Sequence, residues 1–367
     1  MKIPVNNISF FGNEQKYIND CISNSWVGSD GDYVQLFEKK VASFVGRKYA
    51  VACSNGSSAI DMAIHASKLK AGDEVLIPNF TIISCVQYFI LRGIKPIFLD
   101  CNSRTYNIDV DDIKRNITKK TKAILVVHIY GLTVDMDPLI EIANENNLEV
   151  IEDAAEVFGH KYKDKTCGSF GNQSTFSFFP NKHITTGEGG MVLTDDEDTF
   201  EKLKKYRNLY FSQERFIHED FGHNYRMTNI QAALGLAQLE CIDKNLEKKI
   251  HIGNTYNKLL DSSSSFLLPL KETSYCKNIY WVYPLVLNDL NLNKQDLISY
   301  LNAKGVGTRP FFYPLNLQPV VKKYGIKQDG LNISKDLYDK GFYIPSGLSL
   351  TYQEQEYVAS TLLEYVS

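Results

Sequence analysis

Residues 174–190 read Ser-Thr-Phe-Ser-Phe-Phe-Pro-Asn-Lys-His-Ile-Thr-Thr-Gly-Glu-Gly-Gly, and the rest of the chain can be interpreted around them. Apolar and hydroxyl side chains alternate over 174–178, which predicts a buried strand that ends at Pro180. The three glycines allow a sharp turn and a close approach to a ligand before the next expected strand, 191–194. Between the strands stands Lys182. A partly desolvated amine there can have a lowered pKa and act as a nucleophile; the alternative is an exposed loop lysine beside a glycine turn.

The composition bounds the class of protein. The chain has 367 residues, 44% of them hydrophobic, which predicts one large domain and a smaller one. Its net charge of −3 gives no reason to expect a nucleic acid or an acidic membrane surface as a partner. The seven cysteines are scattered and include no C-x-x-C pair, which favours reduced thiols in a cytosol over a disulfide framework or a metal site. No signal peptide and no run of roughly 20 apolar residues is found, so we expect a cytoplasmic protein.

Helical and extended patterns alternate along the first half of the chain. Strands are expected at 49–53, 74–77, 96–99, 123–127, 149–151, 174–178 and 191–194, and helices at 13–23, 33–44, 59–69, 82–91, 110–117 and 137–146. Continuous apolar strands separated by helices indicate an α/β fold with a mostly parallel sheet of seven strands, covered on both faces. In such sheets ligands bind beyond the carboxyl ends of the strands.

The first of these strand ends carries a small polar turn. Ser54-Asn-Gly-Ser-Ser58 follows the strand 49–53 and precedes a strong helix. A strand, a short turn and a helix N-terminus present free backbone N–H groups to a phosphate. The alternative is an ordinary helix cap, in which Ser57 or Ser58 satisfies the helix's own donors.

A second strand end carries acids. The strand 149–151 runs into Glu152-Asp-Ala-Ala-Glu156, and an acid at the end of an apolar strand is costly without a partner. Asp153 could cap a helix, or its carboxylate could face a cationic ring nitrogen. A phosphate site, a carboxylate and Lys182 at one edge are what pyridoxal phosphate needs: a lysine for the Schiff base, and an acid that keeps the pyridine nitrogen protonated.

With these motifs the chain resembles the DegT/StrS family of sugar aminotransferases, which have the aspartate-aminotransferase (type I) fold. The resemblance runs along almost the whole chain, and its motifs are specific in combination. They are Ser54-Asn-Gly-Ser57, Glu152-Asp-Ala-Ala-Glu156, Phe176-Ser-Phe-Phe-Pro-Asn-Lys182, Thr185-Thr-Gly-Glu-Gly-Gly190, Asn224-Tyr-Arg-Met227 and Thr308-Arg-Pro310. Within the family, the patterns are most similar to those of the GDP-perosamine synthases.

The resemblance implies a role for each matching residue. Lys182 would form the Schiff base and move the proton between carbons, Asp153 would pair with the pyridine nitrogen, and Glu156 would lie near the ring hydroxyl. Three residues would hold the phosphate, with a fourth reaching it from the other subunit of a homodimer; in order they are Gly56, Ser57, Ser177 and Asn224. Arg309 would lie near the nucleotide-sugar pocket, whereas Tyr313 would either contact the substrate or pack in the core.

The residue at position 182 also separates two chemistries. Some family members carry His at the lysine position and act as dehydratases; because this chain has Lys182, it is interpreted as an aminotransferase. The neighbouring His183 is expected to be a solvent-facing or packing residue. Two positions depart from the family pattern. Ile82 stands where many relatives have an aromatic ring that stacks on the cofactor, and Asn316 stands where many have His; both are expected near the substrate.

The second half predicts a smaller α+β domain. A long helical stretch over 227–260 is expected to link it to the large domain, so we divide the chain into residues 1–244 and 245–367. Strands are expected at 280–286 and 305–309, and helices at 293–304, 333–340 and 353–366, with Asn293 as an N-cap.

The resemblance implies transamination from L-glutamate to a nucleotide-linked 4-keto-6-deoxy sugar, with GDP-4-keto-6-deoxy-D-mannose as the expected acceptor and GDP-perosamine as the product. Open alternatives keep the chemistry but use a UDP- or dTDP-linked 4-keto sugar, or a small phosphorylated ketone, for surface polysaccharide or O-antigen synthesis. A sugar dehydratase and a non-catalytic regulator are the remaining alternatives.

Overall fold

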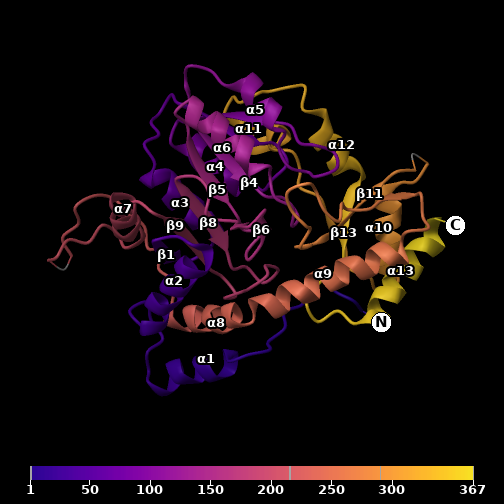
Figure 1. Ribbon diagram of the computed structural model, residues 1–367, viewed down its shortest axis with the longest axis horizontal. Coiled ribbons are helices and arrows are strands. Elements are labelled where there is room, and N and C mark those ends of the chain that lie inside the picture. Colours follow the sequence, from indigo (N-terminus) through magenta and orange to yellow (C-terminus); the bar gives the residue numbers. More distant parts are fainter. Residues whose placement is uncertain (1, 215, 290, 367) are drawn as a thin grey trace.

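A seven-stranded sheet forms the centre of the larger part of the molecule (Figure 1). The computed structural model describes residues 2–214, 216–289 and 291–366. The strand order is β1-β9-β8-β5-β4-β2-β3, and β9 alone runs antiparallel to both of its neighbours. The strands are β1 (Tyr49–Cys53), β2 (Glu74–Pro78), β3 (Lys95–Leu99), β4 (Thr121–Val127), β5 (Glu149–Asp153), β8 (Gln173–Ser177) and β9 (Gly190–Thr194). The predicted mostly parallel α/β sheet is therefore confirmed.

Both faces of this sheet are buried, which explains the continuous apolar strands. Along β4, Ile124 and Val126 join one hydrophobic cluster, while Leu125 and Val127 join the other. Successive strand residues point to opposite faces, so each face needs its own apolar cover. The covering helices are α2 (Asp32–Val45), α3 (Gly56–Ala66), α4 (Ser84–Leu91), α5 (Val110–Asn116), α6 (Met136–Glu145) and α7 (Glu197–Arg207).

Helix α3 begins three residues earlier than the sequence predicted. Its N-cap is Asn55, whose side-chain oxygen accepts the backbone N–H of Ser58 at 2.9 Å. The predicted cap at Ser57 or Ser58 is therefore wrong, because the shorter Asx turn at Asn55 already satisfies that donor. As a result, Gly56 and Ser57 lie in the first turn of the helix.

The predicted helical stretch 227–260 is two helices. Helices α8 (Asn229–Glu240) and α9 (Ile242–Leu259) are separated at Cys241, and Thr228 with Gln231 forms a capping box at the start of α8. Helix α8 packs against α2 and α1 (Glu14–Ser23), whereas α9 packs against α13 (Tyr352–Val366). The pair thus runs along the molecule from the large sheet to the C-terminal region (Figure 1).

A second, antiparallel sheet lies in the C-terminal region, with the strand order β10-β11-β13-β12. Its strands are β10 (Phe266–Leu267), β11 (Tyr283–Leu287), β12 (Arg309–Pro310) and β13 (Gly341–Ile344), and its other helices are α10 (Lys294–Ala303), η1 (Leu315–Leu317), α11 (Pro319–Lys323) and α12 (Asn332–Lys340). Asn293 caps α10 as predicted. The predicted strand 305–309 is wrong, because Gly305 has a φ of +80° and turns the chain, which leaves a bridge at Val306 and a strand from Arg309.

The N-terminal segment belongs spatially to this C-terminal region. Ile3 donates to the carbonyl of Gly305 and accepts from Gly307, both at 2.8 Å, and its side chain joins the hydrophobic cluster around the second sheet. Ser346 donates its backbone N–H to Val5 at 3.0 Å. The division near residue 245 stays a prediction.

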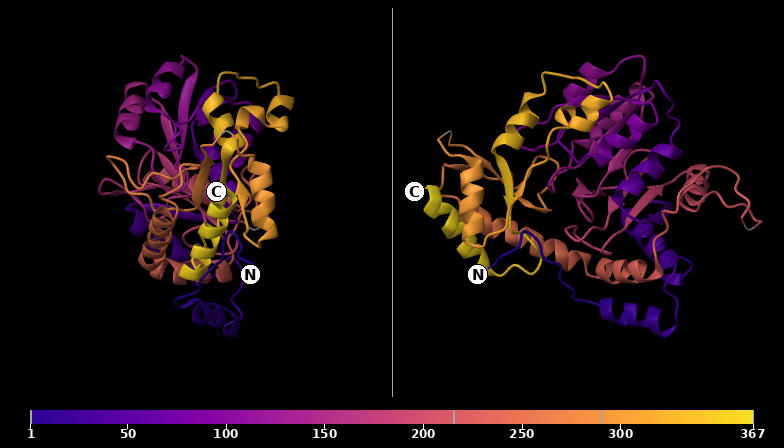
Figure 2. Two further views of the ribbon diagram at one scale, coloured as in Figure 1. Left: turned by 90° about the vertical axis from the view of Figure 1, so that its right-hand side faces the viewer. Right: turned by 180° about the vertical axis from the view of Figure 1, so that it is seen from behind.

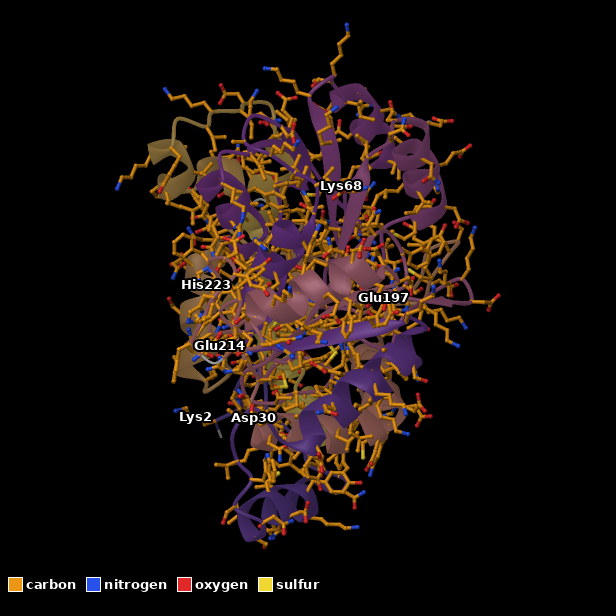
Figure 3. All side chains as sticks on the ribbon, turned by 90° about the vertical axis from the view of Figure 1, so that its left-hand side faces the viewer. Lys2, Asp30, Lys68, Glu197, Glu214 and His223 are labelled. Atoms are coloured by element: carbon orange, nitrogen blue, oxygen red, sulfur yellow. The ribbon has the colours of Figure 1, made fainter. Side chains whose placement is uncertain are left out.

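Two further segments complete the fold. A hairpin of β6 (Lys161–Tyr162) and β7 (Lys165–Thr166), which the sequence patterns did not predict, lies between β5 and β8. Residues 208–214 and 216–227 lie in an arm that extends away from the body of the molecule (Figure 2), and Figure 3 views it from its own side, with Glu214 and His223 labelled. Among the described residues, none of the helices combines the length and the apolar character needed to cross a bilayer.

Candidate active site

The loop between β8 and β9 is fixed by its own backbone. Phe178 donates to the carbonyl of Gly189 and accepts from Thr186, both at 2.9 Å, so the loop folds back on the end of β8. Gly187 has a φ of +78° in this turn. At Gly190, an added Cβ would lie 2.3 Å from the carbonyl oxygen of Asn55, so the glycine is required where β9 passes the start of α3. The predicted glycine turn thus brings the start of β9 against the N-terminus of α3.

The side chain of Lys182 lies among acids and an aromatic ring. Its Nζ atom is 3.9 Å from the centroid of the Trp281 ring. Burial lowers the pKa of the amine below its ordinary value, although the nearby carboxylates of Glu156 and Asp153 act in the opposite direction. A lysine with a lowered pKa holds more of the neutral, nucleophilic amine at neutral pH, which is what the predicted chemistry requires.

Asp153 is the last residue of β5 and is 5% exposed. Its carboxylate accepts the backbone N–H of Ala155 at 3.1 Å and the thiol of Cys85 at 3.5 Å. Burial raises its pKa, while the ammonium of Lys182 acts in the opposite direction. No helix follows directly after β5 in the described chain, so the alternative role as a helix cap is not supported. The carboxylate is placed to meet a cationic partner.

Glu156 is a second buried acid beside the lysine. It is 6% exposed, and its Oε2 atom accepts the backbone N–H of Tyr130 at 2.8 Å. Burial raises the pKa of this carboxyl to about 8, against the effect of Lys182. An acid with such a pKa can hold a proton at neutral pH, so Glu156 can donate a hydrogen bond as well as accept one.

Three of the predicted phosphate-binding residues come together at the start of α3. An added Cβ at Gly56 would lie 2.8 Å from the Cβ atom of Ser177, which ends β8, and the hydroxyl of Ser57 lies 2.7 Å from that of Ser84. The backbone N–H groups of a helix's first turn have no acceptor within the helix. Of these groups in α3, the side chain of Asn55 accepts a hydrogen bond only from the N–H of Ser58. Free N–H groups, hydroxyls and the helix dipole together fit a phosphate dianion.

The described residues therefore fit pyridoxal phosphate. The Gly56–Ser177 approach leaves a cradle that any added side chain would fill, and the anion-binding helix end lies next to a buried carboxylate and a lysine of lowered pKa. Each part of the cofactor would have a matching group: the start of α3 would hold the phosphate, Asp153 would face the ring nitrogen and Lys182 would take the aldehyde.

The cradle at position 56 gives a first testable prediction. Replacing Gly56 by alanine is expected to weaken pyridoxal phosphate binding by about tenfold or more, because the added methyl overpacks the approach to Ser177. Equilibrium titration followed by the visible absorbance of the bound cofactor measures the change. Gly28→Ala is the matched control, since its methyl would meet nothing within 4 Å. Equal cofactor affinity in the two variants would contradict the cradle.

The three remaining predicted residues have different environments. Asn224 is exposed on the arm and forms a backbone bridge with Asn208; its role in a partner subunit stays a prediction. Arg309 is exposed on β12 and is paired in register with Tyr343, a residue whose pKa is raised by burial and by the charge of Glu156. Tyr313 is 37% exposed and packs edge-on against Tyr338, with 4.8 Å between ring centroids.

The two departures from the family pattern have different environments. Ile82 is 49% exposed just before α4, so its side chain is free to make only apolar contact. Asn316 is buried, and both ends of its carboxamide are engaged: Oδ1 accepts from Asn79 at 3.0 Å, and Nδ2 donates to the carbonyl of Gln328 at 2.8 Å. These bonds fix the orientation of the Asn316 side chain. Its expected position near the substrate stays a prediction.

His183 is buried and packs in the interior, so the packing half of that expectation is confirmed and the solvent-facing half is wrong. Burial, together with the nearby charges of Lys249 and Lys182, lowers the pKa of its ring well below the ordinary value. Sequence reasoning missed three neighbours of the centre: Cys85, Tyr130 and Trp281. None has a distinctive spacing, and each lies in an apolar segment that reads as core.

Comparison with known proteins agrees with this geometry. The sequence profile described as the DegT/DnrJ/EryC1/StrS aminotransferase family matches residues 11–363. The chain is 40% identical over 366 residues to a GDP-perosamine synthase of Escherichia coli O157:H7, which covers 100% of this chain and 99% of that protein. It is 37% identical over 353 residues to a GDP-perosamine synthase of Caulobacter vibrioides, which covers 96% of this chain and 95% of that protein.

A solved structure gives the same picture. The aminotransferase from Psychrobacter cryohalolentis is 28% identical, covers 99% of each chain and superposes with a TM-score of 0.92. The fold, the lysine and the acids at the strand ends, and the match along nearly the whole length lead to one conclusion. The chain belongs to the DegT/DnrJ/EryC1/StrS aminotransferase family and is a pyridoxal-phosphate-dependent aminotransferase.

Proposed function

We propose that this aminotransferase transfers the amino group of L-glutamate to GDP-4-keto-6-deoxy-D-mannose and so forms GDP-perosamine. The observation that carries the proposal is the full-length similarity to the two relatives named GDP-perosamine synthase. Lys182, present as lysine rather than histidine, supports transamination over dehydration, and the buried acids beside it support cofactor chemistry over a purely regulatory role.

When bound, pyridoxal phosphate supplies a carbonyl that takes up the amino group and a ring that accepts electrons from the substrate carbon. The chain's own residues do the rest. Gly56, Ser57 and Ser177 hold the phosphate and so fix the position of the ring. Asp153 would face the ring nitrogen, where its carboxylate would stabilise a proton. Lys182 takes a proton from the carbon that loses the amine and, in the second half of the cycle, gives one to the former carbonyl carbon.

Glu156 and Arg309 have supporting roles in this proposal. Glu156, whose carboxyl can carry a proton at neutral pH, would exchange a hydrogen bond with the ring hydroxyl of the bound cofactor. Arg309, on the strand next to Tyr343, offers a charged guanidinium to the diphosphate of a sugar nucleotide. Tyr313, whose ring is 37% exposed, would contact the substrate.

The proposed enzyme works as a homodimer in the cytoplasm. The arm that carries Asn224 exposes large apolar side chains, with Phe221 93% exposed and Ile217 49% exposed, and such surface is usually covered by a partner. In the dimer, Asn224 of the partner subunit would reach the phosphate of this chain's cofactor, and each site would then depend on both subunits. All seven cysteines are free, as expected for a reducing compartment.

The acceptor is tested by incubating the cofactor-loaded protein with L-glutamate and one acceptor at a time, followed by mass spectrometry of the sugar nucleotide. The GDP-linked keto sugar is expected to gain an amine at a rate at least about tenfold above that of UDP- or dTDP-linked 4-keto sugars and of a small phosphorylated ketone. Equimolar 2-oxoglutarate must form. Faster turnover of another acceptor would replace GDP-4-keto-6-deoxy-D-mannose, and loss of oxygen without gain of an amine would indicate a dehydratase.

A further inference from the structure

Trp281 holds the catalytic loop at two points. It lies just before β11 and is 4% exposed. Its indole N–H donates to the carbonyl of Asn181 at 2.8 Å, and the Nζ atom of Lys182 sits 3.9 Å from its ring centroid. One side chain of the small-domain region thus contacts both the peptide before Lys182 and the reactive amine itself.

A buried lysine holds Trp281 from behind. Lys249 of α9 is 2% exposed, and its Nζ atom donates to the carbonyls of Trp281 and Ser346, each at 2.7 Å. Burial lowers the pKa of this amine to about 7, and both acceptors are neutral carbonyls rather than carboxylates. Burying an amine without an acidic partner is costly. If this position only filled apolar space, leucine or methionine would stabilise the fold more than lysine does. The bonds of Lys249 fix the backbone of Trp281 relative to the segment after β13.

The face of the Trp281 ring is therefore a fixed site for a cation. An ammonium over an indole face is attracted by the electron density of the ring, more strongly when both are shielded from water. Lys182 carries an ammonium each time it takes a proton from the substrate carbon, and between proton transfers its long side chain must stay close to that carbon. The groups that face the amine are the carboxylates of Asp153 and Glu156, the thiol of Cys85 and this ring.

We propose that Trp281, held in place by Lys249, is a positioning residue that receives the free amine of Lys182 during each half of the reaction. The ring stabilises the ammonium after Lys182 takes the proton from the donor carbon, and it keeps that proton within reach of the carbon that next accepts it. This inference rests on the proposed role of Lys182 in proton transfer.

A purely structural role predicts something different. Trp281 also belongs to the hydrophobic cluster that covers one face of the large sheet. If packing were its only contribution, leucine and phenylalanine would both lower stability, and neither would change the chemical step selectively. The two interpretations therefore separate in a measurement that isolates the proton transfer from folding and from cofactor binding.

The first test uses the cofactor-free protein and needs no substrate. The chain has two tryptophans, and Trp26 is 55% exposed, so a Trp26→Phe background leaves Trp281 as the sole indole. In this background, Lys182→Met is expected to change the intensity and the pH dependence of the Trp281 emission, because the amine over the ring is gone. Lys122→Met, a substitution of an exposed lysine on β4, is the matched control and should leave the emission unchanged. Identical emission with and without the Lys182 amine would overturn the contact.

The second test is kinetic. Trp281→Leu is expected to bind pyridoxal phosphate with an affinity within about twofold of the parent, while the single-turnover rate with L-glutamate falls about tenfold or more. Glutamate deuterated at the reacting carbon should show a larger isotope effect in this variant, since proton transfer becomes slower. Trp281→Phe keeps an aromatic face and should retain most of the rate. Lys249→Met should lower the rate in the same direction as Trp281→Leu.

The outcomes distinguish a failure of the proposed role of Lys182 from a failure of the role of Trp281 alone. If a Lys182→Ala protein still turns over glutamate normally, the proposed role of Lys182 fails, and with it this inference. If Lys182→Ala is inactive but Trp281→Leu keeps the parent rate and isotope effect, only the role of Trp281 fails. Loss of cofactor affinity in Trp281→Leu would also contradict it, because the ring would then serve cofactor binding rather than the free amine.

Discussion

Replacing Lys182 by alanine is expected to lower the rate of amino transfer from L-glutamate by at least about 10⁴-fold, since one side chain supplies both the nucleophilic amine and the acid–base group. The amine is poised for both tasks, because burial lowers its pKa while Asp153 and Glu156 keep it within reach of protonation. A single-turnover assay of 2-oxoglutarate measures the loss. The visible absorbance band that depends on the bond between lysine and cofactor should disappear as well.

The control for this experiment is Lys122→Ala, which removes an exposed lysine of β4 and should leave both signals intact. We expect the Lys182→Ala protein still to bind the cofactor through its phosphate, because Gly56, Ser57 and Ser177 are unchanged. A Lys182→Ala protein with the parent rate would remove the basis of the proposed mechanism, whatever the acceptor.

Replacing Asp153 by asparagine is expected to lower kcat by about 10²–10³-fold, because the variant loses a preorganised charge opposite the ring nitrogen while its shape is preserved. Asp153 is buried at the end of β5, and its carboxylate is oriented by the N–H of Ala155 and the thiol of Cys85. A neutral amide there no longer stabilises a protonated ring, so the electron-accepting capacity of the cofactor falls. Steady-state kinetics with L-glutamate gives kcat, and the pH dependence of the cofactor's absorbance reports the ring nitrogen.

Asp164→Asn is the matched control, since Asp164 is exposed in the hairpin that follows β6. If Asp153→Asn kept the parent kcat and the parent pH dependence, the carboxylate would have a structural role only. A variant that fails to fold would be recognised by its lowered melting temperature without cofactor, and Asp153→Glu, which keeps a carboxylate, would then test the charge.

The sheet and the centre of the site were predictable because their signals are local. Each strand of the large sheet is a short apolar run, and helices separate the runs, so the rule that parallel strands gather ligands at their carboxyl ends could be applied directly. That rule brought together the turn at Ser54–Ser58, Asp153 and Lys182, and the structure places them at one edge of the sheet.

The failures have tertiary causes. The pattern over 227–260 is helical throughout, and no local signal marks the break at Cys241. The break occurs where the packing partners change, from α1 and α2 for α8 to α13 for α9. The hydrogen bonds of Asn316 could not be predicted, because its partners Asn79 and Gln328 are distant from it in the sequence or lie in a separate loop. Trp281 reads as one apolar residue among several, and only the fold shows that Lys182 and Lys249 approach it from different elements.

The hydrogen bonds of the first residues with the last third of the chain have a consequence for dissection of the molecule. Ile3 fills part of the core around the small sheet, and Val5 and Asn7 accept backbone N–H groups of Ser346 and Leu348. A recombinant piece comprising only 245–367 would therefore expose an apolar hole and orphaned amides, however complete its own helices and strands. Adding a synthetic peptide of residues 2–8 in trans should raise the melting temperature of such a piece, as in fragment complementation.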